Sequence, residues 1–165
     1  MTNETLVIER EFNCSAETLF DMWTKPEHLE KWWAPAGFTT KILNYDLTPG
    51  GVFHYKQTDT NGNENIGLFK YITIDKPNRL EFSSGFANTA GELVKPGFHT
   101  DFPIELHNLV LIEAVDDTHA RLHTEGKPLN GSEAEVNFFK MMHDNMKQGF
   151  EGTYNHLDEY LQSLK

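Results

Sequence analysis

Over the first three quarters of the chain, apolar and polar positions alternate in short segments, which predicts β-strands. Residues 48–51, Thr-Pro-Gly-Gly, separate two of these segments by turn chemistry. Asn61-Gly62 suits a tight hairpin because both residues readily adopt positive φ. The short spacing favours an antiparallel meander. The predicted strands cover residues 6–12, 38–47, 52–59, 66–74, a segment around 80–84, 105–115 and 118–125.

Two short helices are predicted between the first and second strands. Ser15 is a helix N-cap residue, and Glu17 places a negative charge in the first turn. Pro26 suits the first turn of a second helix, whose buried side is expected to include Trp32 and Trp33. Pro35 and Gly37 are expected to end this helix.

From residue 133 to residue 164 the apolar period becomes helical, which predicts one long amphipathic helix. Gly149 and Gly152 are unusual there, since glycine costs about 1 kcal/mol relative to alanine inside a helix. They predict a bend or a close packing contact. The apolar stripe consists of Val136, Phe139, Met142, Met146, Phe150, Tyr154, Leu157, Leu161 and Leu164.

The order of these elements predicts an α+β fold in which a curved antiparallel sheet wraps around the C-terminal helix. The length of 165 residues predicts a single domain over residues 1–165. Strong curvature tends to leave a gap between sheet and helix, and loops or short helices close its mouth. Residues 87–103 contain two glycines and two prolines and predict a long loop, which is either a functional cover or merely mobile.

Aromatic residues make up 12% of the chain, with 12 Phe, 5 Tyr and 3 Trp, and they must fill a core or line a pocket. The net charge of −11 disfavours nucleic-acid binding and stable association with anionic membranes. No signal peptide or transmembrane segment is predicted, so we expect a cytoplasmic protein. One cysteine, Cys14, allows neither an intrachain disulfide nor a thiolate zinc site.

The histidines do not predict a metal site. His119 and His123 are four residues apart on a predicted strand, which separates them by about 13 Å along one face. His99 lies in the long loop, where a solvated side chain is the simplest interpretation and a proton shuttle is the alternative. No metal, cofactor or catalytic residue is therefore assigned. Strand parity places Thr124 on the same face as Ala120 and Leu122, whereas Arg121, His123 and Glu125 form a charge-paired outer face.

Five segments, in order along the chain, resemble the START-like (SRPBCC) proteins of the heat-shock-protein-90 ATPase activator type. The departure is the segment 87–103, which is longer and more polar than the corresponding link. The segments are the strand and helix of Ile8 to Thr24, the Trp32-Trp33-Ala34-Pro35 element, the Pro49-Gly50-Gly51 turn and strand to Tyr55, the Pro77-Asn78-Arg79-Leu80 turn, and the helix from Gly149 to Leu161.

The resemblance implies the helix-grip fold and a hydrophobic cavity, but no particular reaction. We expect a small hydrophobic or aromatic ligand between the sheet and the C-terminal helix. A cyclase or dehydratase acting on an aromatic or polyketide-like substrate is one alternative, and a chaperone-associated interaction domain is another. A chaperone partner and a homodimer are left open. The predicted ligand-binding residues are Trp32, Trp33, Phe53, Tyr55, Phe69, Phe82, Thr124, Met142, Met146 and Phe150.

Overall fold

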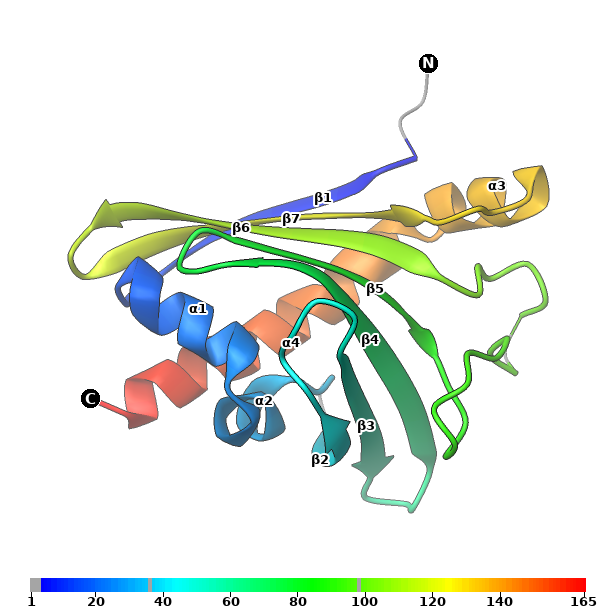
Figure 1. The fold of residues 1–165 in the computed structure, drawn as a ribbon, viewed down its shortest axis with the longest axis horizontal. Coiled ribbons are helices and arrows are strands. Elements are labelled where there is room, and N and C mark those ends of the chain that lie inside the picture. Colours follow the sequence, from blue (N-terminus) through cyan, green and yellow to red (C-terminus); the bar gives the residue numbers. More distant parts are fainter. Residues whose placement is uncertain (1–3, 36, 98) are drawn as a thin grey trace.

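The computed structural model describes residues 4–35, 37–97 and 99–165, and in that part of the chain seven antiparallel strands form one curved sheet. The sheet has the order β1-β7-β6-β5-β4-β3-β2, and the long helix α4 crosses its concave face (Figure 1). The strands are β1 (Leu6–Phe12), β2 (Phe38–Tyr45), β3 (Val52–Asp59), β4 (Glu64–Asp75), β5 (Arg79–Phe86), β6 (Leu106–Asp116) and β7 (His119–Pro128). The helices are α1 (Ala16–Thr24), α2 (Pro26–Trp32), α3 (Glu133–Met141) and α4 (His143–Ser163).

The predicted α+β helix-grip architecture is confirmed, and the strand bounds differ from the predicted ones by only a few residues. The parity predicted for β7 also holds, because Ala120 and Leu122 are buried whereas Arg121 is exposed. Register shifts in the β2–β3, β4–β5 and β6–β7 pairs increase the local twist and help the sheet to curve.

The helices α1 and α2 close one end of the curved sheet. Ser15 caps α1 as predicted, since its side chain accepts a hydrogen bond from the Thr18 backbone N–H at 3.1 Å. Pro26 opens α2, which ends at Trp32. The Trp32 side chain is fully buried, and its indole N–H donates to the Met22 carbonyl oxygen at 2.8 Å.

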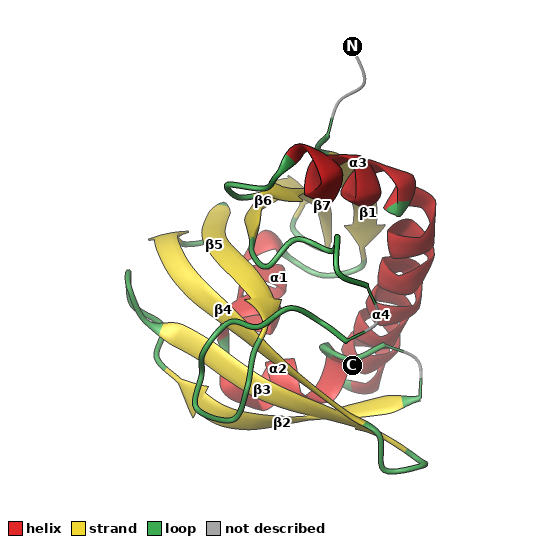
Figure 2. Ribbon diagram, turned by 90° about the vertical axis from the view of Figure 1, so that its right-hand side faces the viewer, coloured by secondary structure: helices red, strands yellow, loops and turns green. Residues whose placement is uncertain are grey.

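The prediction of one helix over residues 133–164 is wrong, because the segment forms two helices that meet at Met142. The Met142 N–H donates to the carbonyl oxygens of both Phe138 and Phe139, each at 3.1 Å, so the last turn of α3 tightens. Figure 2 shows that α3 and α4 run in clearly different directions. Apolar periodicity could not reveal this break, because the apolar faces of α3 and α4 both point inward.

Of the two interpretations of the helical glycines, the close packing contact is wrong. Gly149 and Gly152 lie inside the uninterrupted helix α4. A Cβ atom built on either glycine would have no neighbour within 4 Å, so no close packing contact requires them.

The C-terminal half of α4 packs into the solid part of the core. Tyr154, Leu157 and Leu161 are buried there against the sheet and the two short helices. The His156 Nδ1 atom donates to the Ala34 carbonyl oxygen at 2.8 Å and so ties α4 to the end of α2. These contacts fix the position of α4 across the sheet.

The outer face of the β1–β7 pair carries a histidine between two carboxylates. The His123 Nδ1 atom lies 3.0 Å from a Glu9 oxygen, and its Nε2 atom lies 2.8 Å from a Glu125 oxygen. The hydrogen bond to Glu125 is the main cause that raises the pKa of His123 above its ordinary value of 6.5, although partial burial opposes the shift. The predicted charge-paired outer face is therefore present.

We expect this histidine to make stability pH-dependent. A raised pKa means that the folded state binds the proton more tightly, so the contribution is complete below about pH 6 and is lost as pH rises through the folded pKa. The difference in unfolding free energy between the wild type and His123→Gln should therefore shrink between about pH 6 and pH 8.5 in urea titrations. A difference that stays constant over this range would show that the pair contributes nothing through protonation.

No helix of the described residues combines the length and apolar character needed to cross a membrane.

Candidate functional site: a cavity between the sheet and α4

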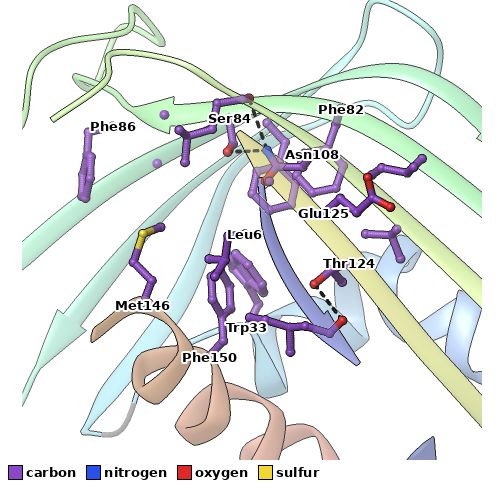
Figure 3. A pocket seen from close by; sticks show the side chains of 18 of the residues that line it. Leu6, Trp33, Phe82, Ser84, Phe86, Asn108, Thr124, Glu125, Met146 and Phe150 are labelled. Atoms are coloured by element: carbon purple, nitrogen blue, oxygen red, sulfur yellow. Dashed lines mark hydrogen bonds between the residues drawn. The ribbon is translucent and has the colours of Figure 1, made fainter. Parts of the chain in front are cut away.

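The concave face of the sheet and the helix α4 partly enclose a cavity of about 220 Å³ (Figure 3). Met146, Phe150 and Tyr154 of α4 contribute to its wall, whereas Leu157 and Leu161 further along the helix pack solidly in the core. Most of the remaining wall is apolar and comes from strands β1 and β3 to β7. The cavity therefore occupies the place where a curved sheet separates from the helix that it grips.

Aromatic rings form the floor of the cavity. The rings of Phe69 and Phe82 stack with centroids 4.2 Å apart, and Trp33 meets Phe69 edge to face at 5.3 Å. Tyr55 and Phe150 stand at 6.4 Å from Trp33. Such a surface offers both ring faces and ring edges to an aromatic occupant.

Local structure holds Trp33 in place on this floor. The residue follows the last turn of α2, and its N–H donates to the Leu29 carbonyl oxygen at 3.0 Å. Its own carbonyl oxygen accepts hydrogen bonds from the Thr40 hydroxyl and, at 3.1 Å, from the Gln57 amide. Strands β2 and β3 therefore both anchor the backbone of Trp33 beside the cavity.

Polar groups are few in the cavity wall. The Asn108 amide donates to the Ser84 hydroxyl oxygen at 2.7 Å across β6 and β5. The Thr124 hydroxyl lies 3.5 Å from the Ile8 carbonyl oxygen, a long contact (Figure 3). These groups are suited to orient a ligand rather than to bind it by charge.

Two tyrosines in the wall remain protonated at neutral pH. Burial raises the pKa of Tyr55 to about 12, although the neighbouring Trp33 indole acts in the opposite direction. Burial also raises the pKa of Tyr154, which the nearby Thr124 hydroxyl partly offsets. Both phenols are therefore neutral hydroxyl groups rather than bases.

The loop of residues 87–103, between β5 and β6, and the helix α3 each contribute a phenylalanine to the cavity wall, Phe102 and Phe139. Phe102 lies in the loop and lines the cavity next to Phe86, with ring centroids 5.9 Å apart. Lys95 fixes the loop, because its ammonium group donates to the Thr100 and Phe102 carbonyl oxygens and pairs with Glu135 of α3. The exposed His99 ring stacks on Phe138 of α3, with centroids 3.9 Å apart.

The structure places seven of the ten predicted ligand-binding residues in the cavity wall. These are Trp33, Tyr55, Phe69, Phe82, Thr124, Met146 and Phe150. Their contact with a ligand stays a prediction.

The other three, Trp32, Phe53 and Met142, lie outside the wall. Trp32 and Phe53 are fully buried in the solid core. Met142 occupies the break between α3 and α4. Strand and helix parity predicted the correct face for the first two, but a face does not reveal where the core ends and the cavity begins.

Several wall residues were missed by the sequence prediction. Gln57 shares its strand face with Tyr55, and Ser84 shares one with Phe82, so parity could have found both. Phe102 could not have been found, because a loop carries no periodicity. The further missed residues with side chains of interest are Leu6, Ile8, Trp23, Phe86, Asn108, Val110, Phe139 and Tyr154.

The one cysteine of the chain, Cys14, is not among the residues that line the cavity. Cys14 is buried, and desolvation raises its pKa to about 11, which makes its thiol a poor nucleophile. Within the described residues, no three His, Cys, Asp or Glu side chains come together as a metal site would require.

Comparison with known proteins agrees with this fold. Residues 13–162 match the family model described as "Activator of Hsp90 ATPase homolog 1-like protein". Among curated proteins, none matches the chain.

Solved structures show the same fold over nearly the whole chain. The crystal structure of protein Ms6760 from Mycobacterium smegmatis has 25% identity and a TM-score of 0.75, covering 95% of this chain and 90% of that one. A solution structure from Arthrobacter aurescens has 24% identity and a TM-score of 0.80, covering 99% and 90%. One from Staphylococcus epidermidis has 20% identity and a TM-score of 0.78, covering 100% and 93%. The chain belongs to the Activator of Hsp90 ATPase homolog 1-like family of the START-like (SRPBCC) superfamily.

Proposed function

We propose that the protein binds a small hydrophobic or aromatic molecule in the cavity between the sheet and α4. The observation that carries this proposal is a partly enclosed space of about 220 Å³ whose floor is made of aromatic rings. Filled cores leave few voids larger than a water molecule, so a space of this size costs stability unless something occupies it.

The volume limits the ligand to about one or two rings. An apolar cavity of roughly 150 Å³ accepts benzene, and drug-sized ligands occupy roughly 300–1,000 Å³. A cavity of about 220 Å³ lies between these cases. A fused bicyclic molecule fits this space better than a phospholipid with two acyl chains.

The polar groups of the wall favour binding over acid–base catalysis. A cyclase or dehydratase would need a carboxyl or imidazole group that is free to act in the cavity, but the one carboxylate among the described lining residues, Glu125, is paired with His123 on the outer face. The two phenols of the wall, Tyr55 and Tyr154, have raised pKa values and stay protonated. They can donate hydrogen bonds to a ligand, but they are poor general bases near neutral pH.

Titration with tetralin, a fused bicyclic hydrocarbon, tests the proposal. We expect one molecule to bind per chain with a Kd on the order of 0.1 mM or tighter in isothermal titration calorimetry. Met146→Ala should weaken binding about threefold to tenfold with a smaller effect on unfolding, because Met146 lines the cavity and is only half-buried. Met141→Ala is the matched control, since Met141 is 74% exposed outside the wall. Absence of saturable tetralin binding would refute the proposal.

A chaperone partner has separate support. The family description names an activator of the Hsp90 ATPase, which is a property of the protein behind that name. In the present chain this partner stays a prediction, as does the homodimer.

A further inference from the structure

Two polar groups in the cavity wall lack a hydrogen-bond partner. In the described part of the chain, the buried side-chain atoms without a partner are Trp23 Nε1, Trp33 Nε1 and the Tyr71 hydroxyl. Trp23 and Trp33 both line the cavity, and their rings lie 5.6 Å apart. A buried donor without an acceptor is costly, so it calls for an explanation wherever it occurs.

The neighbouring tryptophan shows the ordinary arrangement. Trp32 is fully buried outside the cavity, and its indole N–H donates to the Met22 carbonyl oxygen. Trp33 follows it directly in sequence, yet its N–H has no such acceptor. The indole N–H of Trp32, in the core, therefore has a hydrogen-bond acceptor, whereas the indole N–H of Trp33, at the cavity wall, has none.

The Tyr55 hydroxyl is the polar neighbour of the Trp33 indole. The indole acts on the pKa of Tyr55, so the two groups interact, but they do not meet the geometry of a hydrogen bond. Tyr55 lies on the cavity floor in edge-to-face contact with Trp33, with centroids 6.4 Å apart. Two donors, an N–H and an O–H, thus stand side by side in the wall.

The wall provides no positive charge to accompany these donors. Among the described lining residues there is no Lys, Arg or His, and the one carboxylate, Glu125, pairs with His123 on the outer face. An anionic ligand would be desolvated here without a counter-charge, which is unfavourable. The donors therefore suit a neutral acceptor.

We propose that Trp33, assisted by Tyr55, selects cavity ligands that carry an uncharged hydrogen-bond acceptor, such as a carbonyl or ether oxygen, on an aromatic frame. The inference rests on the proposed binding function and specifies its ligand class. A rotation of the indole turns Nε1, which is buried in this structure, toward the cavity, where it donates to the acceptor while the ring system of the ligand packs against the floor rings. A pure hydrocarbon fills the same space but leaves the indole N–H without an acceptor.

The test compares tetralin with 1-tetralone, which differs by one carbonyl group in place of a methylene. The acceptor preference is the ratio of the Kd for tetralin to the Kd for 1-tetralone, measured by calorimetry. Trp33→Phe keeps an aromatic ring and removes the N–H, so we expect the preference to fall about threefold to tenfold, the range of one hydrogen bond. Trp32→Phe removes an N–H outside the cavity. Its ring lies against that of Trp33, with centroids 5.5 Å apart, but a packing change there acts on both compounds alike, so the preference should stay within about twofold of the wild type.

Two further measurements keep the test decisive. Tyr55→Phe removes only the hydroxyl and should also reduce the preference, so it serves if Trp33→Phe does not fold. The carbonyl stretch of bound 1-tetralone should lie at lower wavenumber in the wild type than in Trp33→Phe, because a donor N–H weakens the C=O bond.

The possible results distinguish a failure of the acceptor inference from a failure of the proposed binding function. An unchanged preference in both Trp33→Phe and Tyr55→Phe, with tetralin still bound, would overturn the acceptor inference and leave the binding function intact. Failure of the wild type to bind either compound would remove the proposed function itself.

Discussion

Gly67→Ala should weaken tetralin binding at least tenfold and lower the free energy of unfolding by about 1–3 kcal/mol. A Cβ atom at Gly67 would lie 2.3 Å from the Tyr55 hydroxyl oxygen and 2.4 Å from its Cζ atom. The Tyr55 ring packs against Phe53 on one side, with centroids 4.7 Å apart, so it can move only by repacking the floor of the cavity. The displaced phenol would occupy part of the space that the ligand needs.

The matched control is Gly149→Ala. This glycine lies in α4 with no atom near its missing Cβ, so alanine should stabilise the helix by about 0.5–1 kcal/mol and leave tetralin affinity unchanged. Calorimetry and urea unfolding of both variants measure the two effects. Unchanged tetralin affinity in a folded Gly67→Ala protein would show that the ring of Tyr55 does not border the ligand.

Strand parity and turn chemistry carried most of the fold prediction. Each strand has its own turn signals and its own alternating face, so the meander could be read locally and its β7 face assigned correctly. The break at Met142 could not be read in this way. It depends on how α3 packs against β7 and α4 against β1 and α2, which is a property of the assembled fold.

The cavity wall was predictable only in part, for a physical reason. Sequence periodicity reports which side of an element faces inward, and both a packed core and a cavity wall lie inward. Two adjacent tryptophans illustrate this limit, because Trp32 lies in the core whereas Trp33 lines the cavity. On α4 the same apolar stripe passes from Met146 in the wall to Leu157 in the core. The transition depends on how far the curved sheet stands from the helix, and no single residue encodes that distance.

Because α4 borders the cavity near its start and the solid core near its end, we expect residues at its two ends to affect different properties of the protein. The C-terminal half, with Leu157 and Leu161, holds the helix in the sheet, whereas Met146 and Phe150 face the ligand space. A substitution in the first group should therefore act on unfolding, and one in the second group on affinity.

Leu157→Ala is expected to lower the free energy of unfolding by about 3 kcal/mol, within the usual range of about 2–5 kcal/mol for buried leucines. Leu157 is completely buried in the main core cluster and does not line the cavity. Leu164→Ala removes the same atoms from a side chain that is 53% exposed, so it should change stability by less than about 0.5 kcal/mol.

Urea unfolding of both leucine variants gives the stability difference, and tetralin titration below the unfolding transition gives the affinity. Because the hole left at Leu157 would lie in the solid core, the Kd for tetralin should stay within about twofold of the wild type. A stability loss below about 1 kcal/mol would mean that the C-terminal half of α4 is not what anchors the helix. A large loss of affinity in a folded protein would instead mean that the cavity depends on the packing of the whole helix rather than on its first half.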